Sequence, residues 1–168
     1  MTQNLPFEVL RQLRAQGRTL ATAESCTGGL IGKLLTDVPG SSEVYMGGVI
    51  SYTNGVKHRL LGVSEDTLRV YTAVSRQTAH EMAHGAREAV QADVGVSVTG
   101  LAGPDGDGVH PVGTVFVSLS DGKRTWVREK HITDRDRKTV RLYACQNVFD
   151  MVRRYLAGLP VEQKRSDI

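Results

Sequence analysis

The chain has 168 residues, enough for one domain that buries roughly two thirds of the surface its unfolded form exposes. Two cysteines cannot build a disulfide framework and no apolar run is long enough to cross a bilayer, so we expect a soluble, cytoplasmic protein. The net charge of +3 and the isoelectric point near 9.0 are mildly basic, and the aromatic content of 5% disfavours a nucleic-acid partner.

Apolar spacing and turn residues predict alternating helices and strands in the first half of the chain. We expect a first helix that begins after a cap at Asn4 and ends at Gly17, followed by a strand over 19–23. The next expected elements are a helix over 27–37, a strand over 48–52, a short helix capped by Asn54 and stopped by Gly62, and a second short helix from about Ser64.

The second half continues this alternation and adds a hairpin. A helix opens at Ser75 and runs to about Gln91, a nearly continuous apolar strand covers 94–99, and a glycine-rich loop covers 100–108. The last expected elements are strands over 112–119 and 125–132 joined by an Asp121-Gly122 turn, a helix over 134–156, and a frayed tail over 158–168. The chain therefore predicts one α/β domain over 1–168 with an ordered core over about 5–157. Its sheet of about five strands is mostly parallel, has helices on both faces, and contains one antiparallel strand.

Three strand ends in this pattern carry polar residues, and ligands of open α/β sheets bind where strands end and helices begin. The first is Ser25-Cys26-Thr27-Gly28-Gly29, the second is Tyr52 with Lys57 further along, and the third is Thr99-Gly100. Sequence alone leaves ordinary roles open: Ser25 or Thr27 as a helix cap, Lys57 as a solvated lysine, Tyr52 as a half-buried strand aromatic, and the glycines as a loop.

If these ends meet, their residues support nucleophilic hydrolysis. A serine needs a neighbouring base, and a desolvated lysine can be neutral near pH 7 and accept the proton directly or through a tyrosine hydroxyl. A Ser–Lys pair is an accepted variant of the Ser–His arrangement. The N–H groups at a helix start can stabilise an oxyanion, and those of a glycine-rich loop can bind a phosphate.

Several motifs occur in a fixed order over about residues 5–157. They are Ala23-Glu24-Ser25-Cys26-Thr27-Gly28-Gly29, Val49-Ile50-Ser51-Tyr52-Thr53-Asn54 with Lys57 and Leu61-Gly62-Val63, Ala73-Val74-Ser75, and Thr99-Gly100-Leu101-Ala102-Gly103-Pro104-Asp105-Gly106 with Pro111-Val112-Gly113-Thr114-Val115. Together they resemble the CinA C-terminal domain family, whose stand-alone members are nicotinamide mononucleotide (NMN) deamidases of the PncC type. The resemblance implies hydrolysis of the NMN carboxamide to nicotinic acid mononucleotide and ammonia. It also implies a three-layer α/β/α sandwich with a mixed sheet, a homodimer, and no metal or cofactor.

The resemblance further assigns roles to single residues. The family's serine nucleophile, tyrosine and lysine fall on Ser25, Tyr52 and Lys57, and its two arginines near the last helix fall on Arg137 and Arg141. Oxyanion and substrate binding are then expected from Cys26, Thr27, Gly28, Gly29, Thr99, Gly100, Gly103, Arg137 and Arg141. The large N-terminal domain of full-length CinA proteins is not in this sequence, which is therefore a stand-alone enzyme or part of a longer protein.

Two alternative sites compete with this interpretation. His80-Glu81-Met82-Ala83-His84 matches the zinc-hydrolase pattern of two histidines one helical turn apart, although Arg87 and Val90 replace the Gly and His of the extended pattern. Both rings are expected to face solvent. Cys26 competes with Ser25 as nucleophile, because a helix start lowers the pKa of a thiol.

Two further features bear on function. The basic pI and the arginine cluster over 135–141 also suit a non-catalytic nucleotide- or DNA-associated module. A calcium loop that begins at Asp105 is excluded, because its twelfth position would be Phe116, which cannot bind calcium.

Overall fold

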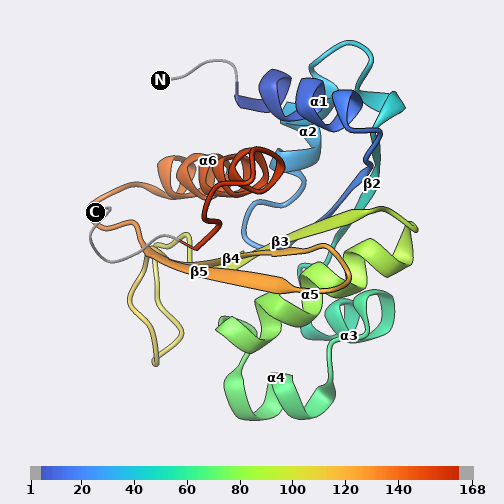
Figure 1. The fold of residues 1–168 in the computed structure, drawn as a ribbon. Coiled ribbons are helices and arrows are strands. Elements are labelled where there is room, and N and C mark those ends of the chain that lie inside the picture. Colours follow the sequence, from blue (N-terminus) through green and yellow to red (C-terminus); the bar gives the residue numbers. More distant parts are fainter. Residues whose placement is uncertain (1–4, 163–168) are drawn as a thin grey trace.

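A computed structural model describes residues 5–162 as a five-stranded mixed sheet with helices on both faces (Figure 1). The strands lie in the order β2 (Tyr45–Ile50), β1 (Leu20–Glu24), β3 (Val94–Gly100), β4 (Thr114–Ser120) and β5 (Thr125–His131). β1 is parallel to β2 and β3, whereas β4 is antiparallel to β3 and β5. Four strands therefore point one way and β4 points the other, which confirms the expected α/β sheet with one antiparallel strand.

The helices form the two outer layers of the sandwich (Figure 1). One layer contains α1 (Leu5–Ala15), α2 (Leu30–Thr36) and α6 (Arg137–Leu156), with a short 3-10 turn η1 (Ser41–Glu43) beside α2. In the other layer α5 (Arg76–Ala89) lies on the sheet, and α3 (Asn54–Leu61) and α4 (Glu65–Tyr71) pack against α5. This arrangement is the expected three-layer α/β/α sandwich.

The sheet is buried from both sides at its centre. Every residue of β1 and β4 is buried, as is every residue of β3 except the last, which matches their apolar sequences. The larger apolar cluster lies between the sheet and the α1–α6 layer, and includes Leu20, Val96, Val117, Phe149 and Val152. This rigid centre holds the carboxyl ends of β1 and β3 side by side.

β1 and the end of α2 lie within one residue of the expected bounds, and three other features of the first half differ from those expected. The helix after β1 begins at Leu30 rather than at residue 27, because residues 25–29 form a turn in which Gly28 and Gly29 have φ of 58° and 100°. β2 covers 45–50 rather than 48–52, so Tyr52 lies in a loop beyond the strand. The cap of α3 is Thr53 and not Asn54: the Thr53 Oγ1 accepts the N–H of Val56 at 3.4 Å.

The second half shows the expected hairpin and two further shifts. The Asp121 N–H donates to the Arg124 carbonyl at 3.1 Å and closes the turn between β4 and β5. β4 begins at residue 114 rather than 112. The residue before it, Gly113, has φ 91°, and an added Cβ would lie 2.0 Å from the Ile132 carbonyl oxygen, so only glycine fits this position. The last helix begins at 137 rather than 134, because Asp136 is its cap and accepts the N–H of Thr139 at 2.7 Å.

The two ends of the chain are described only in part. Asn4, the expected first cap, and residues 163–168 of the expected tail lie outside the described residues. Val161 is buried, and its carbonyl accepts a hydrogen bond of 2.6 Å from the Arg128 Nε, so the expected fraying does not extend to Val161. No helix between residues 5 and 162 is both long and apolar enough to cross a membrane.

Candidate active site

The polar ends of β1, β2 and β3 open into one pocket of about 320 Å³. The sequence-predicted site residues that line it are Ser25, Cys26, Tyr52, Lys57, Thr99, Gly100, Gly103 and Arg137. The other lining residues are Ala73, Val74, Leu101, Ala102 and Asp105. Four predicted site residues are not among those that line it: Thr27, Gly28, Gly29 and Arg141.

Ser25 and Lys57 are in direct contact in the buried part of the pocket. The Lys57 Nζ lies 3.0 Å from the Ser25 Oγ, although the two residues are 32 positions apart in the chain. Lys57 is 1% exposed and Ser25 is 8% exposed. The Lys57 Nζ also donates to the Ser51 carbonyl at 2.7 Å, which fixes its position beside the serine. We call Ser25 and Lys57 the dyad.

The environment of Lys57 favours its neutral form. Burial removes water from the ammonium group and lowers the pKa of Lys57 from 10.5 to about 8. At that pKa roughly a tenth of the amine is unprotonated at pH 7 and most of it is unprotonated at pH 9. A neutral amine at hydrogen-bonding distance can take the serine proton, so the dyad has the geometry of a nucleophile and its base, and the fraction of Lys57 that is neutral can act as that base.

Glu24 shapes the turn that presents Ser25. Its buried carboxylate accepts hydrogen bonds from the Thr27 hydroxyl at 2.7 Å and from three backbone N–H groups of the turn and the α2 start, those of Gly29, Ile31 and Gly32, at 2.9–3.1 Å. The N-cap residue of α2 is Gly29, and the carboxylate of Glu24 satisfies the N–H groups at the helix start in place of a side chain of Ser25 or Thr27. Because Ser25 follows Glu24 directly, these bonds fix the backbone at the nucleophile.

The carboxylate of Glu24 also decides which N–H groups are left for a substrate. The N–H of Gly29 is bonded to Glu24, and the N–H of Gly28 donates to the Ser25 carbonyl at 3.1 Å. Within residues 5–162, no hydrogen bond pairs the N–H of Cys26 or Thr27 with another residue. Cys26 lines the pocket, whereas Thr27 is fully buried and does not line it, so the N–H of Cys26 is the one that a substrate can reach.

Two arginines of α6 occupy different positions around the site. Arg141 donates to the carbonyls of Cys26 and Thr27 at 3.1 and 2.7 Å, so it holds the serine turn from behind. Arg137 lines the pocket, where it donates to the Gly103 carbonyl at 2.5 Å and to the Tyr52 hydroxyl at 3.4 Å. Arg141 is thus bonded to the backbone of the serine turn, whereas Arg137 is exposed at the pocket.

Tyr52 stands at the entrance of the pocket rather than beside the dyad. Its side chain is 61% exposed, and its hydroxyl bonds Arg137. No hydrogen bond within residues 5–162 joins Tyr52 to either member of the dyad. Asp105 and Arg137 are also exposed and line the same pocket, so we call Tyr52, Asp105 and Arg137 the mouth.

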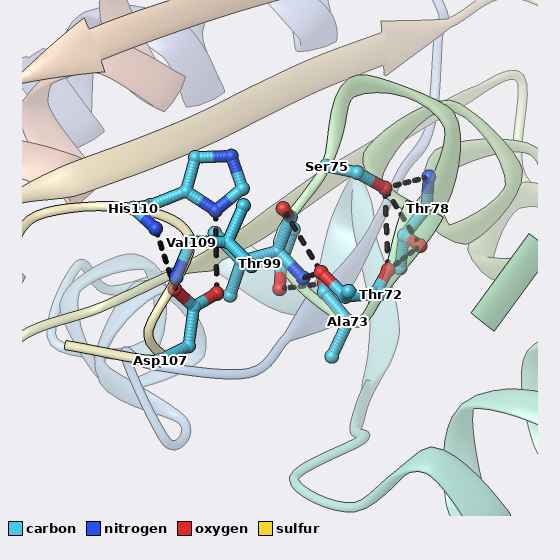
Figure 2. Close-up of polar contacts among 9 residues, drawn as sticks. Thr72, Ala73, Ser75, Thr78, Thr99, Asp107, Val109 and His110 are labelled. Carbon is cyan, nitrogen blue, oxygen red and sulfur yellow. Dashed lines mark hydrogen bonds and ion pairs between the residues drawn. The ribbon is translucent and has the colours of Figure 1, made fainter. Parts of the chain in front are cut away.

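The third wall of the pocket is held by a cluster of hydroxyl groups (Figure 2). The Thr99 Oγ1 donates to the Ala73 carbonyl at 2.7 Å, and the Thr78 Oγ1 donates to the Thr72 carbonyl at 2.7 Å. These bonds hold Thr72 at φ 68° and ψ 176°, a backbone conformation that residues other than glycine rarely adopt. The Thr99 hydroxyl therefore positions the wall at Ala73.

Two competing interpretations of the sequence lose support here. Burial raises the pKa of the Cys26 thiol to about 12, so the expectation that the helix start activates this thiol is wrong. In the zinc pattern, the Glu81 carboxylate accepts hydrogen bonds from the Ser64 N–H at 2.6 Å and from the Thr67 hydroxyl at 2.5 Å. The two histidines of the pattern, His80 and His84, are exposed. No group of three or more His, Cys, Asp or Glu residues within 5–162 is placed to hold a metal ion.

Sequence reasoning missed Glu24, the Ser51 carbonyl and Asp105. Glu24 stood inside a quoted motif, and an acidic residue just before a helix is the signal that could have identified it as a cap. The carbonyl of Ser51 carries no sequence signal at all. Asp105 could have been found as the first acidic residue of the glycine-rich loop that follows β3.

Comparison with known proteins places these features in a family. The family model described as the CinA C-terminal domain matches residues 2–156. A CinA-like protein from Desulfovibrio desulfuricans is 49% identical over 162 residues, which are 95% of this chain and 38% of that protein. The chain thus spans less than half the length of this relative.

Solved structures agree with the sequence match. The competence/damage inducible protein CihA from Agrobacterium tumefaciens is 38% identical, with a TM-score of 0.88 over 92% of this chain and 94% of that one. A CinA superfamily protein from Klebsiella pneumoniae 700603 is 31% identical, with a TM-score of 0.90 over 94% and 99% of the two chains.

Proposed function

The chain belongs to the CinA C-terminal domain family, and on that premise we propose that it is an amidohydrolase that converts NMN to nicotinic acid mononucleotide and ammonia. The observation that carries the proposal is the 3.0 Å contact between the Lys57 Nζ and the Ser25 Oγ in a pocket open to small molecules. An amide is a demanding substrate for hydrolysis, and a serine with a neutral lysine beside it is suited to that reaction.

In the first half-reaction, neutral Lys57 takes the Ser25 proton while the Ser25 oxygen attacks the carboxamide carbon. The carbonyl oxygen becomes an oxyanion, and the N–H group of Cys26, which lines the pocket, stabilises it. Protonated Lys57 then donates the proton to the leaving nitrogen. Ammonia departs, and the ring is left as an ester on Ser25.

In the second half-reaction, water attacks that ester. Lys57, neutral again, takes a proton from the water and returns it to the Ser25 oxygen as the tetrahedral intermediate releases nicotinic acid mononucleotide. The sum consumes one NMN and one water and yields the acid and ammonia. The direct contact within the dyad makes Tyr52 unnecessary as a proton relay, so Tyr52 serves substrate binding at the mouth.

Arg137 holds the phosphate of the nucleotide in this proposal. It lines the pocket, whereas Arg141 is bonded to two carbonyls behind the serine turn. A guanidinium group binds phosphate through two parallel hydrogen bonds, and binding energy at the remote phosphate helps to orient the carboxamide at the dyad.

The homodimer is likewise a proposal, and light scattering in solution tests it.

The test is incubation of the purified protein with NMN, with ammonia and nicotinic acid mononucleotide both measured. We expect equal amounts of the two products from the unaltered protein and none above background from Ser25→Ala. The matched control is Cys26→Ala, which removes the neighbouring thiol and should retain activity. If Ser25→Ala still releases ammonia, or if ammonia release is lost only in Cys26→Ala, Ser25 is not the nucleophile. An inactive unaltered protein contradicts the proposed substrate.

A further inference from the structure

The mouth contains one acidic side chain that the proposed mechanism leaves unused. Among the described residues that line the pocket, Asp105 is the only Asp or Glu, and Lys57 and Arg137 are the only Lys or Arg. Within residues 5–162 the Asp105 carboxylate has no hydrogen bond and no ion pair. Folding does not use this charge, although it lies at the pocket.

The loop that carries Asp105 is held on both sides of that residue. Before it, the Gly103 carbonyl accepts the bond from Arg137. After it, the Asp107 carboxylate accepts the N–H groups of Val109 and His110 at 2.9 and 2.6 Å (Figure 2). The His110 ring packs edge-on against Phe116, with ring centroids 6.0 Å apart. The two acidic residues of the loop thus differ: Asp107 shapes the loop, and Asp105 presents its charge.

The charges of the pocket complement those of the proposed substrate. NMN carries an anionic phosphate and a cationic pyridinium ring. A sphere with the pocket's volume of 320 Å³ is about 8 Å across, close to the Debye length of roughly 8 Å at physiological ionic strength. A charge at the wall is therefore felt throughout the pocket. The Asp105 carboxylate repels the phosphate toward Arg137 and attracts the ring.

We propose that Asp105 is a specificity-determining residue that selects nucleotides with a cationic pyridinium ring over those with a neutral ring. The inference rests on the proposed function and narrows its substrate class to zwitterionic pyridinium nucleotides. The reduced form of NMN has nearly the same size, ribose and phosphate, but its dihydropyridine ring is neutral. Asp105 therefore favours NMN over reduced NMN by roughly tenfold, the effect of one charge pair at a partly exposed site.

The experiment measures dissociation constants for NMN and reduced NMN by calorimetry. The Ser25→Ala background prevents turnover during the titration. The expected preference for NMN is about tenfold in this background, and it should fall to about twofold or less when Asp105→Asn is added. Asp105→Glu should restore it. The matched control is Asp107→Asn, which removes the other carboxylate of the loop and should leave the preference unchanged.

The ratio separates selection by charge from other roles of Asp105. If Asp105 bonds the ribose or has a purely structural role, Asp105→Asn weakens the binding of NMN and of reduced NMN equally. The ratio of the two dissociation constants then stays unchanged, which overturns the proposal. Failure of the proposed function is a separate result. If the unaltered protein releases no ammonia but Ser25→Ala binds NMN with the Asp105-dependent preference, the proposed selection by charge is supported and the proposed deamidation is overturned. If NMN does not bind, both the proposed function and the proposed role of Asp105 are overturned.

Discussion

The dyad and the mouth lie in one pocket but are built in opposite ways. Lys57 is 1% exposed and is held by two hydrogen bonds, whereas Tyr52 is 61% exposed and makes one long bond of 3.4 Å to Arg137. Burial shifts the pKa of Lys57 and so prepares the chemistry before a substrate arrives. The charges of the mouth stay in water and are available to a ligand. Changes in the dyad should therefore affect the chemical step, and changes in the mouth should affect binding.

The largest expected effect comes from removing the base. Lys57→Met keeps a long apolar side chain in the buried site but has no amine, and we expect kcat to fall by a factor of about 10³ or more. Steady-state ammonia release from NMN measures this loss, with circular dichroism to show that the variant is folded. A loss confined to KM would mean that Lys57 binds substrate and would remove the distinction between the dyad and the mouth.

The second effect is on stability. The folded pKa of Lys57 is about 8 and its ordinary value is 10.5, so the unfolded chain binds more protons between these pH values and the unfolding free energy rises with pH. The rise from pH 8 to 10.5 amounts to about 3 kcal/mol. Urea unfolding at several pH values should show that Lys57→Met lacks this contribution.

Lys33→Met is the matched control for the stability measurement. The Lys33 ammonium is exposed and pairs with Asp37 at 2.5 Å on the surface of α2. Its removal should leave the pH dependence of the unaltered protein intact. An equal pH dependence in the unaltered protein and Lys57→Met would show that Lys57 is not held in a charge-disfavouring site.

The third effect concerns the mouth. Arg137→Ala should raise KM for NMN by about 10- to 100-fold, because a charged hydrogen bond to the phosphate is lost, while kcat changes by less than about threefold. Lys138→Ala removes the adjacent, exposed cation and should leave KM unchanged. A fall in kcat with constant KM would instead assign Arg137 to the chemical step.

The smallest effect is expected for Tyr52→Phe. The phenol hydroxyl contacts Arg137 and neither member of the dyad, so kcat should fall by less than about threefold. Ammonia release at saturating NMN measures this change. A loss as large as that of Lys57→Met would make Tyr52 the proton relay that the sequence chemistry left open.

The same contrast explains what could be predicted from sequence. Buried elements have strong patterns, so the continuous apolar run of β3 and the amphipathic α5 were found with small boundary errors. Ser25 and Lys57 were nominated by the polar strand ends and by the resemblance, but no local rule could show that residues 32 positions apart would meet at 3.0 Å. Their contact depends on the alignment of β1 with β2, which is a property of the whole sheet.

The remaining errors arose where a polar side chain binds backbone. Serine and threonine are the usual helix caps, so sequence reasoning left Ser25 and Thr27 open as caps of α2 and overlooked a buried glutamate. Arg141 was expected to bind substrate, and in the structure its guanidinium group donates to the carbonyls of the serine turn. Such long-range pairings of a side chain with backbone leave no periodic trace in sequence.

The pH dependence of kcat/KM for ammonia release from NMN tests the central claim most directly. If the buried dyad performs the reaction, the rate should rise about tenfold from pH 7 to pH 9 with an inflection near 8, as Lys57 loses its proton. Absence of ammonia at every pH, or a rate that is flat between pH 7 and 9, would contradict the claim.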